Sequence, residues 1–173
     1  FGARGPEDAR YRWVLDPVDG TAGFTIGVPL FGTLVALLEN GSPVVGVIHF
    51  PAINETVNAA RGEGCCFRTA DTETTVAVDP VDALSEATVT STALHSSDVT
   101  AADDQTPYRL TDVVRQAGKF RFVTDCLQHA LVARGRTHAA IDTLMRPWDV
   151  AALVPCVREA GGVAAPLDPN ADD

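Results

Sequence analysis

Two apolar runs rich in β-branched residues flank a turn signal in the first half of the chain. The runs are Phe31–Leu38 and Val44–Phe50, and Asn40-Gly41-Ser42-Pro43 lies between them. Asn-Gly is favoured in tight turns between antiparallel strands because both residues tolerate a positive φ. The pattern therefore predicts a β-hairpin, and a first half built around an antiparallel sheet.

Further strand-like segments surround this hairpin. Arg12–Asp16 is expected to be a short strand running into a Pro/Gly turn, and two more strands are expected on either side of Arg61-Gly62-Glu63, over Glu55–Ala60 and Gly64–Arg68. Residues 1–78 are therefore interpreted as a β-rich antiparallel part.

The pattern changes after about Val78, where strand-like and helix-like segments alternate. The expected strands are Ala87–Ser91, Phe120–Thr124 and His138–Asp142, and the expected helices are Asp103–Gly118, Leu127–Arg134 and Pro147–Ala160, with a possible kink at Pro155 and a polar surface loop over Ser96–Thr106. Such alternation is typical of α/β architecture. Residues 79–173 are interpreted as an α/β part.

Charge and cysteine usage limit the classes of function. Thirteen basic and 23 acidic residues give a net charge of −10, which argues against nucleic-acid and anionic-membrane partners. No apolar run reaches the ~18 residues of a membrane span, and no signal peptide is recognised. The cysteines at 65, 66, 126 and 156 lack zinc-ligand spacing and are expected to be reduced thiols. These features favour a cytoplasmic protein.

The first candidate site motif is Trp13-Val-Leu-Asp16-Pro-Val-Asp19-Gly20-Thr21. Two carboxylates follow a strand and bracket a proline, so Asp16, the Val18 carbonyl and Asp19 can converge. Hard oxygen ligands of this kind suit Mg²⁺, with Mn²⁺ as an alternative. The same residues are also typical of an acidic β-turn, so both interpretations stay open.

The second candidate motif is Arg146-Pro147-Trp148-Asp149-Val150-Ala151-Ala152. Proline is favoured in a first helical turn, and aspartate is favoured at the positive end of a helix. By itself the motif indicates a helix N-terminus and nothing more.

Together the two motifs resemble the signatures of the inositol monophosphatase superfamily of metal-dependent phosphomonoesterases. Val14-Leu15-Asp16-Pro17-Val18-Asp19-Gly20-Thr21 is similar to the first signature, and Trp148-Asp149-Val150-Ala151-Ala152, with Glu159-Ala160-Gly161-Gly162, to the second. The resemblance runs from about Trp13 to Val163. It implies an α/β sugar-phosphatase fold, a layered αβαβα sandwich, in which residues 1–78 and 79–173 form one catalytic unit.

The resemblance also implies roles for individual residues. Metal ligands would be Asp16, the Val18 carbonyl, Asp19 and Asp149, and Asp16, Asp19 and Thr21 would be catalytic. The amides of Gly20 and Thr21 would hold phosphate. Substrate would also contact Asp125, Asp142 and Asp149. Asp142 stands where the family usually has a longer glutamate, and Thr124 replaces a usual glycine.

Within the superfamily, the chain is most similar to the histidinol-phosphatase type. Gly27 to Leu37, Met145 to Leu153 and the Asp125-Cys126 pair carry that similarity, whereas Gly23 and Ile26 stand where the inositol branch usually has Asn and His. The implied reaction is hydrolysis of a small anionic phosphate ester, best matched by L-histidinol phosphate. Inositol monophosphate or a nucleotide 3′-phosphate are alternatives, and a homodimer is an open expectation.

The chain also differs from the family pattern at its ends. It begins at Phe1-Gly2, where the family has a preceding Gly-Glu-Glu segment that supplies a metal ligand, and Glu7 and Asp8 lie too close to Asp16 to replace it. Two N-terminal helices and the last strand and helix of the family fold are not recognised either. A chain truncated at both ends is therefore expected, with an inactive fragment or interaction module as the alternative from another class.

Overall fold

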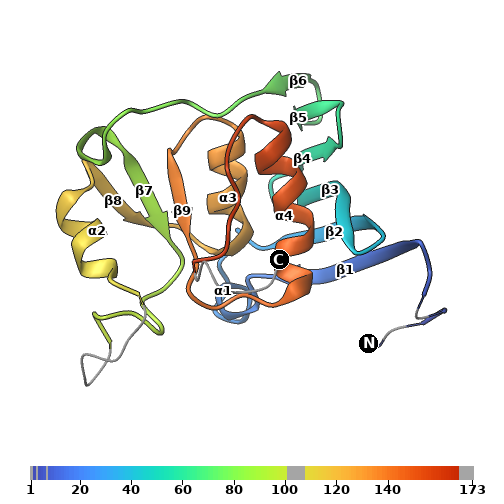
Figure 1. The fold of residues 1–173 in the computed structure, drawn as a ribbon, viewed down its shortest axis with the longest axis horizontal. Helices are drawn as coiled ribbons and strands as arrows, with labels where there is room; N and C mark the ends of the chain where they lie inside the picture. Colours follow the sequence, from blue (N-terminus) through green and yellow to red (C-terminus); the bar gives the residue numbers. More distant parts are fainter. Residues whose placement is uncertain (1, 3, 7, 101–107, 168–173) are drawn as a thin grey trace.

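The computed structural model describes residues 2, 4–6, 8–100 and 108–167 of the 173-residue chain. The described residues form two β-sheets with helices between and beside them (Figure 1). This layered arrangement of sheets and helices confirms the predicted α/β fold class.

The first sheet is an antiparallel meander of six strands in the order β1-β2-β3-β4-β5-β6. Its strands are β1 (Tyr11–Asp19), β2 (Gly32–Glu39), β3 (Ser42–Phe50), β4 (Glu55–Ala60), β5 (Gly64–Arg68) and β6 (Glu73–Val76). The predicted hairpin is confirmed, since β2 and β3 pair antiparallel and both Asn40 (φ 50°) and Gly41 (φ 85°) have a positive φ. Strands β4 and β5 have the predicted bounds, whereas β1 is longer than expected and β6 was not predicted.

The second sheet is parallel, with the order β8-β7-β9. Its strands are β7 (Thr88–Ser91), β8 (Lys119–Phe122) and β9 (Ala139–Ile141). The helices are α1 (Thr21–Thr25), α2 (Leu110–Gln116), α3 (Asp125–Ala133) and α4 (Pro147–Glu159), and a 3₁₀ turn covers Leu84–Glu86. The parallel strands alternate with helices as the sequence predicts, because each parallel connection needs a crossover.

Several predicted bounds need correction. The helix expected over Asp103–Gly118 begins only at Leu110, after an irregular Tyr108-Arg109 pair, and its expected first residues lie in 101–107, outside the described residues. The loop expected on the surface after Ser96 is partly inside, because Ser97 is fully buried and its hydroxyl donates to the Leu94 carbonyl at 2.6 Å. Helix α4 continues past Pro155 to Glu159.

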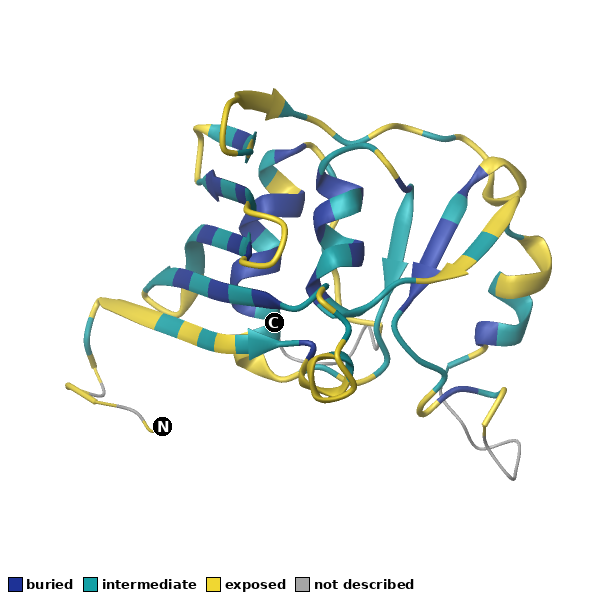
Figure 2. Ribbon diagram, turned by 180° about the vertical axis from the view of Figure 1, so that it is seen from behind, coloured by how far each residue is buried: buried dark blue, intermediate teal, exposed yellow. Residues whose placement is uncertain are grey.

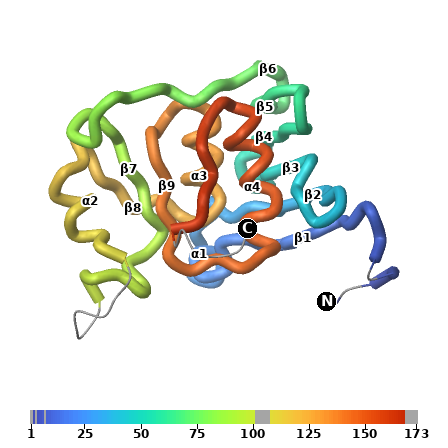
Figure 3. Tube along the Cα trace, viewed as in Figure 1, coloured from blue at the N-terminus to red at the C-terminus, as the bar shows by residue number. Residues whose placement is uncertain are grey.

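The core lies between the six-stranded sheet and the helices α3 and α4 (Figures 1 and 3). Large side chains of the sheet, such as Ile48 and Phe50, pack against small helix residues such as Ala130 and Ala152, and all four are fully buried. Gly46 permits the closest approach, because a Cβ there would stand 2.2 Å from the Ala152 carbonyl oxygen. The two halves of the chain thus share one core.

The opposite face of the six-stranded sheet is much more open. In the part of the chain that the structure describes, no helix covers this face, and the strand β1 appears yellow with teal bands in Figure 2, since its residues are exposed or of intermediate burial. Trp13 and Leu15 are 63% and 60% exposed there, and they pair with Leu37 and Val35 of β2. One sheet face is therefore packed, and the other presents an apolar strip to solvent.

The four cysteines are free, and three of them are buried, with Cys66 of intermediate exposure, as expected for reduced thiols. Among the described residues, no helix has the length and apolar character needed to cross a membrane.

Candidate active site

The end of β1 brings the first motif into a bulged conformation. The pairing of β1 with β2 shifts register between Asp16 and Asp19, and the Val18 N–H donates to Asp16 Oδ1 at 3.1 Å. A bulge redirects side chains that would otherwise follow the strict alternation of a strand. This is how two aspartates three residues apart come to serve one site. The role of the Val18 carbonyl as a ligand stays a prediction.

Gly20 then turns the chain from β1 into α1. Its φ of 83° lies in the left-handed region, and a Cβ at this position would be 2.9 Å from Asp125 Oδ2. Both the turn and the close approach require glycine. The motif therefore needs Gly20 for its shape, whether or not the Gly20 amide also binds a ligand.

The second motif forms the N-terminus of α4, as predicted. Pro147 is the first helical residue, and the Arg146 N–H donates to Asp149 Oδ2 at 2.8 Å. This bond fixes the Asp149 side chain over the first turn of the helix, where the helix dipole favours a carboxylate.

The two motifs meet in space. One carboxylate oxygen from each of Asp16, Asp19 and Asp149 lies within 4.8 Å of the others. Three carboxylates this close repel one another unless a cation or protons are present. Oxygen donors at this spacing fit a hard divalent cation, which is the donor set that the sequence predicted.

The acid strengths of these groups reflect the crowding. The pKa of Asp19 is raised to about 6, chiefly by burial and further by the charges of Asp125 and Asp149, although hydrogen bonds from Cys126 lower it. The pKa of Asp149 is also raised, by burial first and then by Asp16. Without a cation, burial and crowding thus make both groups harder to ionise than a free aspartate.

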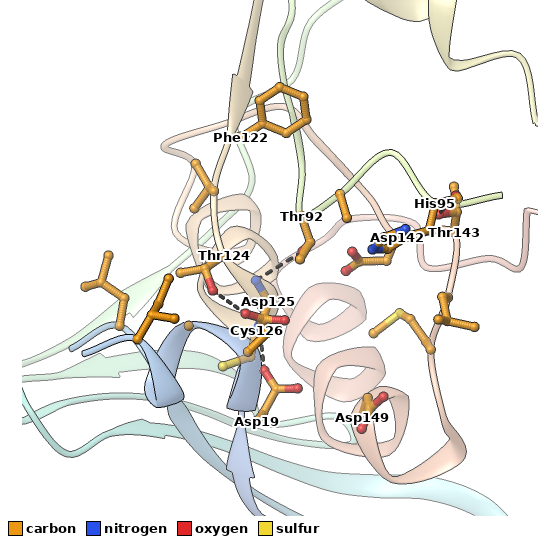
Figure 4. Close-up of a pocket in the computed structure, with 18 residues that line it drawn as sticks. Asp19, Thr92, His95, Phe122, Thr124, Asp125, Cys126, Asp142, Thr143 and Asp149 are labelled. Carbon is orange, nitrogen blue, oxygen red and sulfur yellow. Dashed lines mark hydrogen bonds between the residues drawn. The ribbon is translucent and has the colours of Figure 1, made fainter. Parts of the chain in front are cut away.

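The start of α3 forms the adjoining wall. The Cys126 N–H donates to Asp19 Oδ2 at 2.8 Å, and the Asp125 N–H donates to Thr92 Oγ1 at 3.0 Å (Figure 4). Thr124 Oγ1 donates to Asp125 Oδ2. Burial and the nearby Asp19 raise the pKa of the Cys126 thiol, so this cysteine stays a neutral packing group.

A pocket of about 660 Å³ opens beside the carboxylates. Its acidic lining residues are Asp19, Asp125, Asp142 and Asp149, and no lysine or arginine is among the described lining residues. Apolar side chains, including Phe122, Leu144 and Met145, line the rest. The pocket is thus strongly acidic and partly apolar.

The predicted substrate residues have different positions relative to this pocket. Asp125, Asp142 and Asp149 line it, and so does Thr124. Gly20 and Thr21 lie beside Asp19 at the start of α1 but are not lining residues. Their proposed contacts with phosphate and water stay predictions.

Sequence reasoning missed a group of residues behind Asp142. Gln128 Nε2 donates both to Thr92 Oγ1 and to Asp142 Oδ2. No sequence pattern placed His129 at the site, yet its Nε2 lies 2.8 Å from the same Asp142 oxygen. Thr92 and Asp142 directly follow two neighbouring parallel strands, which is the position where ligand-binding residues of α/β sheets gather, so strand order would have supplied the signal.

Known structures share this fold. An inositol monophosphatase from Zymomonas mobilis superimposes with a TM-score of 0.78 at 29% identity, covering 89% of this chain and 57% of that one. Mycobacterium tuberculosis SuhB gives a TM-score of 0.77 at 28% identity, over 90% and 62% of the two chains.

Sequence relatives point the same way. A histidinol-phosphatase from Chlorobaculum parvum is 38% identical over 151 residues, which is 87% of this chain and 55% of that protein. One from Mycobacterium tuberculosis is 38% identical over 91% of this chain and 59% of that protein. An inositol-1-monophosphatase from Mesorhizobium japonicum is 31% identical over 99% and 62%. The chain thus spans little more than half the length of these relatives.

Fold and site together define a layered α/β protein with three convergent carboxylates. Residues 2–172 match the profile of the inositol monophosphatase family, and the chain belongs to that family.

Proposed function

We propose that this chain forms the metal-binding and substrate-binding part of a phosphomonoesterase, and that its substrate is L-histidinol phosphate. The observation that carries the choice of substrate is the acidic pocket with no lysine or arginine among its described lining residues. Histidinol phosphate carries a primary ammonium group, which Asp125 and Asp142 could bind. Inositol phosphate carries no cationic group, so these two carboxylates could only accept hydrogen bonds from its hydroxyls.

Asp16, Asp19 and Asp149 would hold the metal, which we propose to be Mg²⁺, together with the Val18 carbonyl. Their oxygen atoms and close spacing fit such an ion, and the raised pKa of Asp19 indicates a site that favours added positive charge. When bound, divalent cations polarise phosphoryl oxygens and make water a stronger nucleophile at neutral pH. Family membership supports metal dependence but not the particular ion.

The chain's own groups would position the reactants. Asp125 and Asp142 would orient the alcohol half of the ester, and the apolar side chains of Phe122 and Leu144 would exclude water from it. The Gly20 and Thr21 backbone N–H groups would donate hydrogen bonds to a phosphate oxygen, and the Thr21 hydroxyl would orient the attacking water. Positioning of this kind lowers the entropic part of the barrier before any bond changes.

The test compares phosphate release from L-histidinol phosphate and from inositol 1-phosphate, with Mg²⁺ and with EDTA. We expect kcat/KM to be higher for histidinol phosphate, and release to stop in EDTA. Equal or better hydrolysis of inositol phosphate would overturn the proposed substrate. Hydrolysis that survives both EDTA and Asp19→Asn would overturn the proposed metal site.

A folded chain with no hydrolysis of either ester would support the alternative of an inactive fragment. Extending the chain at its N-terminus with the corresponding segment of a relative would then separate a missing ligand from a wrong assignment. Restored turnover would support the phosphatase function for the longer protein.

A further inference from the structure

Gln128 occupies an unusual place behind the pocket. Its side chain is fully buried on α3, and its Nε2 donates to Asp142 Oδ2 at 2.7 Å and to Thr92 Oγ1 at 2.8 Å. The Ile141 carbonyl lies at 3.5 Å, at the limit of hydrogen-bond distance. One buried amide therefore joins the ends of β7 and β9, the two strands that these acceptors follow.

The same network fixes both acidic walls of the pocket. Thr92 Oγ1 also accepts the N–H of Asp125, and Asp142 Oδ2 also accepts from His129 Nε2 at 2.8 Å. An ionised carboxylate has no proton to donate. Facing such a carboxylate, Gln128 Nε2 and His129 Nε2 are therefore both hydrogen-bond donors to Asp142 Oδ2. With Oδ2 held from behind, the Asp142 carboxylate is directed into the pocket (Figure 4).

The Gln128 side-chain amide leaves one of its polar atoms without a hydrogen bond. Its Oε1 is buried without a hydrogen-bond partner. Turning the amide over would place Oε1 against the Asp142 carboxylate, which is a repulsive pair of acceptors, so the observed orientation is the better of two imperfect ones. A core position selected for stability alone would favour an apolar side chain, because buried polar groups are normally satisfied.

We propose that Gln128 is a positioning residue that sets substrate preference by holding Asp142 and, through Thr92, Asp125. This inference rests on the proposed function, because it assumes that these carboxylates contact the substrate. Gln128 itself does not line the pocket among the described residues, so it acts through its two partners.

The test replaces Gln128 with methionine, which has a similar length but no donor. We expect kcat/KM for histidinol phosphate, relative to inositol 1-phosphate, to fall about tenfold, through KM more than kcat, because a hydrogen bond to a charged group is lost. Val132→Ala is the matched control, since Val132 is buried one turn along the same helix and truncation loosens the core without touching the network. Its preference should stay unchanged.

His129→Phe provides a second variant in case Gln128→Met does not fold, since the His129 side chain is 15% exposed and tolerates replacement better. It removes the other donor to Asp142, so it should also lower kcat/KM for histidinol phosphate relative to inositol 1-phosphate. A double-mutant cycle with Asp142→Asn should show that Gln128→Met has little further effect once the charge is gone. Unchanged preference in folded Gln128→Met or His129→Phe, or a similar change in Val132→Ala, would overturn the proposal.

A readout without turnover separates this proposal from the proposed function. The side-chain amide signals of Gln128, followed by nuclear magnetic resonance, should shift in Asp142→Asn and stay in place in Val132→Ala. If neither the wild-type chain nor its N-terminally extended form hydrolyses either ester, the proposed function fails, and unmoved Gln128 signals would then overturn the positioning role as well. Shifted signals would support the role of Gln128 in holding Asp142.

Discussion

Two groups of carboxylates lie in or beside the same pocket, and their hydrogen-bond donors differ. Asp16, Asp19 and Asp149 crowd within 4.8 Å of one another, with a backbone N–H as the donor to each. Asp142, in contrast, receives two side-chain donors on a single oxygen. The first group therefore favours a cation from outside, while the Asp142 carboxylate is held by donors that the fold itself supplies.

The largest expected effect comes from neutralising one member of the crowded group. Asp19→Asn should lower turnover about a hundredfold or more, because an amide is a poor ligand and the remaining two carboxylates hold the cation less well. Steady-state phosphate release measures the loss. The same substitution should leave the metal-free fold intact, since it removes repulsion, and a melted Asp19→Asn chain in EDTA would contradict this account.

The second effect is a pH dependence of metal-free stability. The pKa of Asp19 is about 6 in the folded chain against an ordinary value of 3.8, so folding favours its protonated form. This stabilisation is fully present below about pH 3.8 and is lost as the pH rises through about 6. Urea unfolding in EDTA should show a fall in the free energy of unfolding of up to about 3 kcal/mol over this window.

Asp19→Asn provides the control for that pH dependence. The amide does not titrate, so the decline between about pH 4 and pH 7 should be much shallower in the variant. An identical decline in both proteins would assign the pH dependence to other groups.

The third effect is stabilisation by added metal. Mg²⁺ at about 100 times its dissociation constant should add about 2.7 kcal/mol to the free energy of unfolding. For a chain of this size that corresponds to a rise of about 5–10 °C in Tm. Thermal melting with and without Mg²⁺ measures it, and Asp149→Asn should lose most of the rise. An equal rise in Asp149→Asn would place the ion elsewhere.

The smallest effect should be a loss of metal-free stability in Asp142→Asn, a loss that Asp19→Asn should not show. Asp142→Asn weakens the bonds from Gln128 and His129, so it should lower the free energy of unfolding by about 1 kcal/mol even without metal. Asp19→Asn should not lower it under the same conditions. Urea unfolding of both variants in EDTA makes the comparison, and a loss of the same size in both would remove the distinction between the two groups.

Local chain chemistry made part of this predictable. The Asn40-Gly41 turn, the Gly20 turn after β1 and the Pro147 start of α4 each depend on neighbouring residues, and all of them were recognisable in the sequence. The strand β1 continues through Pro17 to Asp19, where the sequence had predicted that the turn already begins. The short strand β6 (Glu73–Val76) was not, because its residues are mostly exposed and depend on pairing with β5.

The network behind Asp142 shows the other limit. Thr92, Gln128 and Asp142 come from three separate segments, and no spacing rule within one segment relates them. Family resemblance drew attention to Asp142 because it aligns with a known position. It gave no indication of Gln128, whose importance depends on a contact that only the folded chain creates.

Gly46 links the packing of the core to the position of the proposed metal ligand Asp149. Because its missing side chain lets Ala152 lie directly against β3, it sets how deeply α4 is seated, and Asp149 lies one turn earlier on that helix. Any larger residue at position 46 would lift the helix and carry Asp149 with it. In an activity screen such a variant would lose turnover like a variant of Asp149 itself, although position 46 is on β3 and outside the carboxylate cluster.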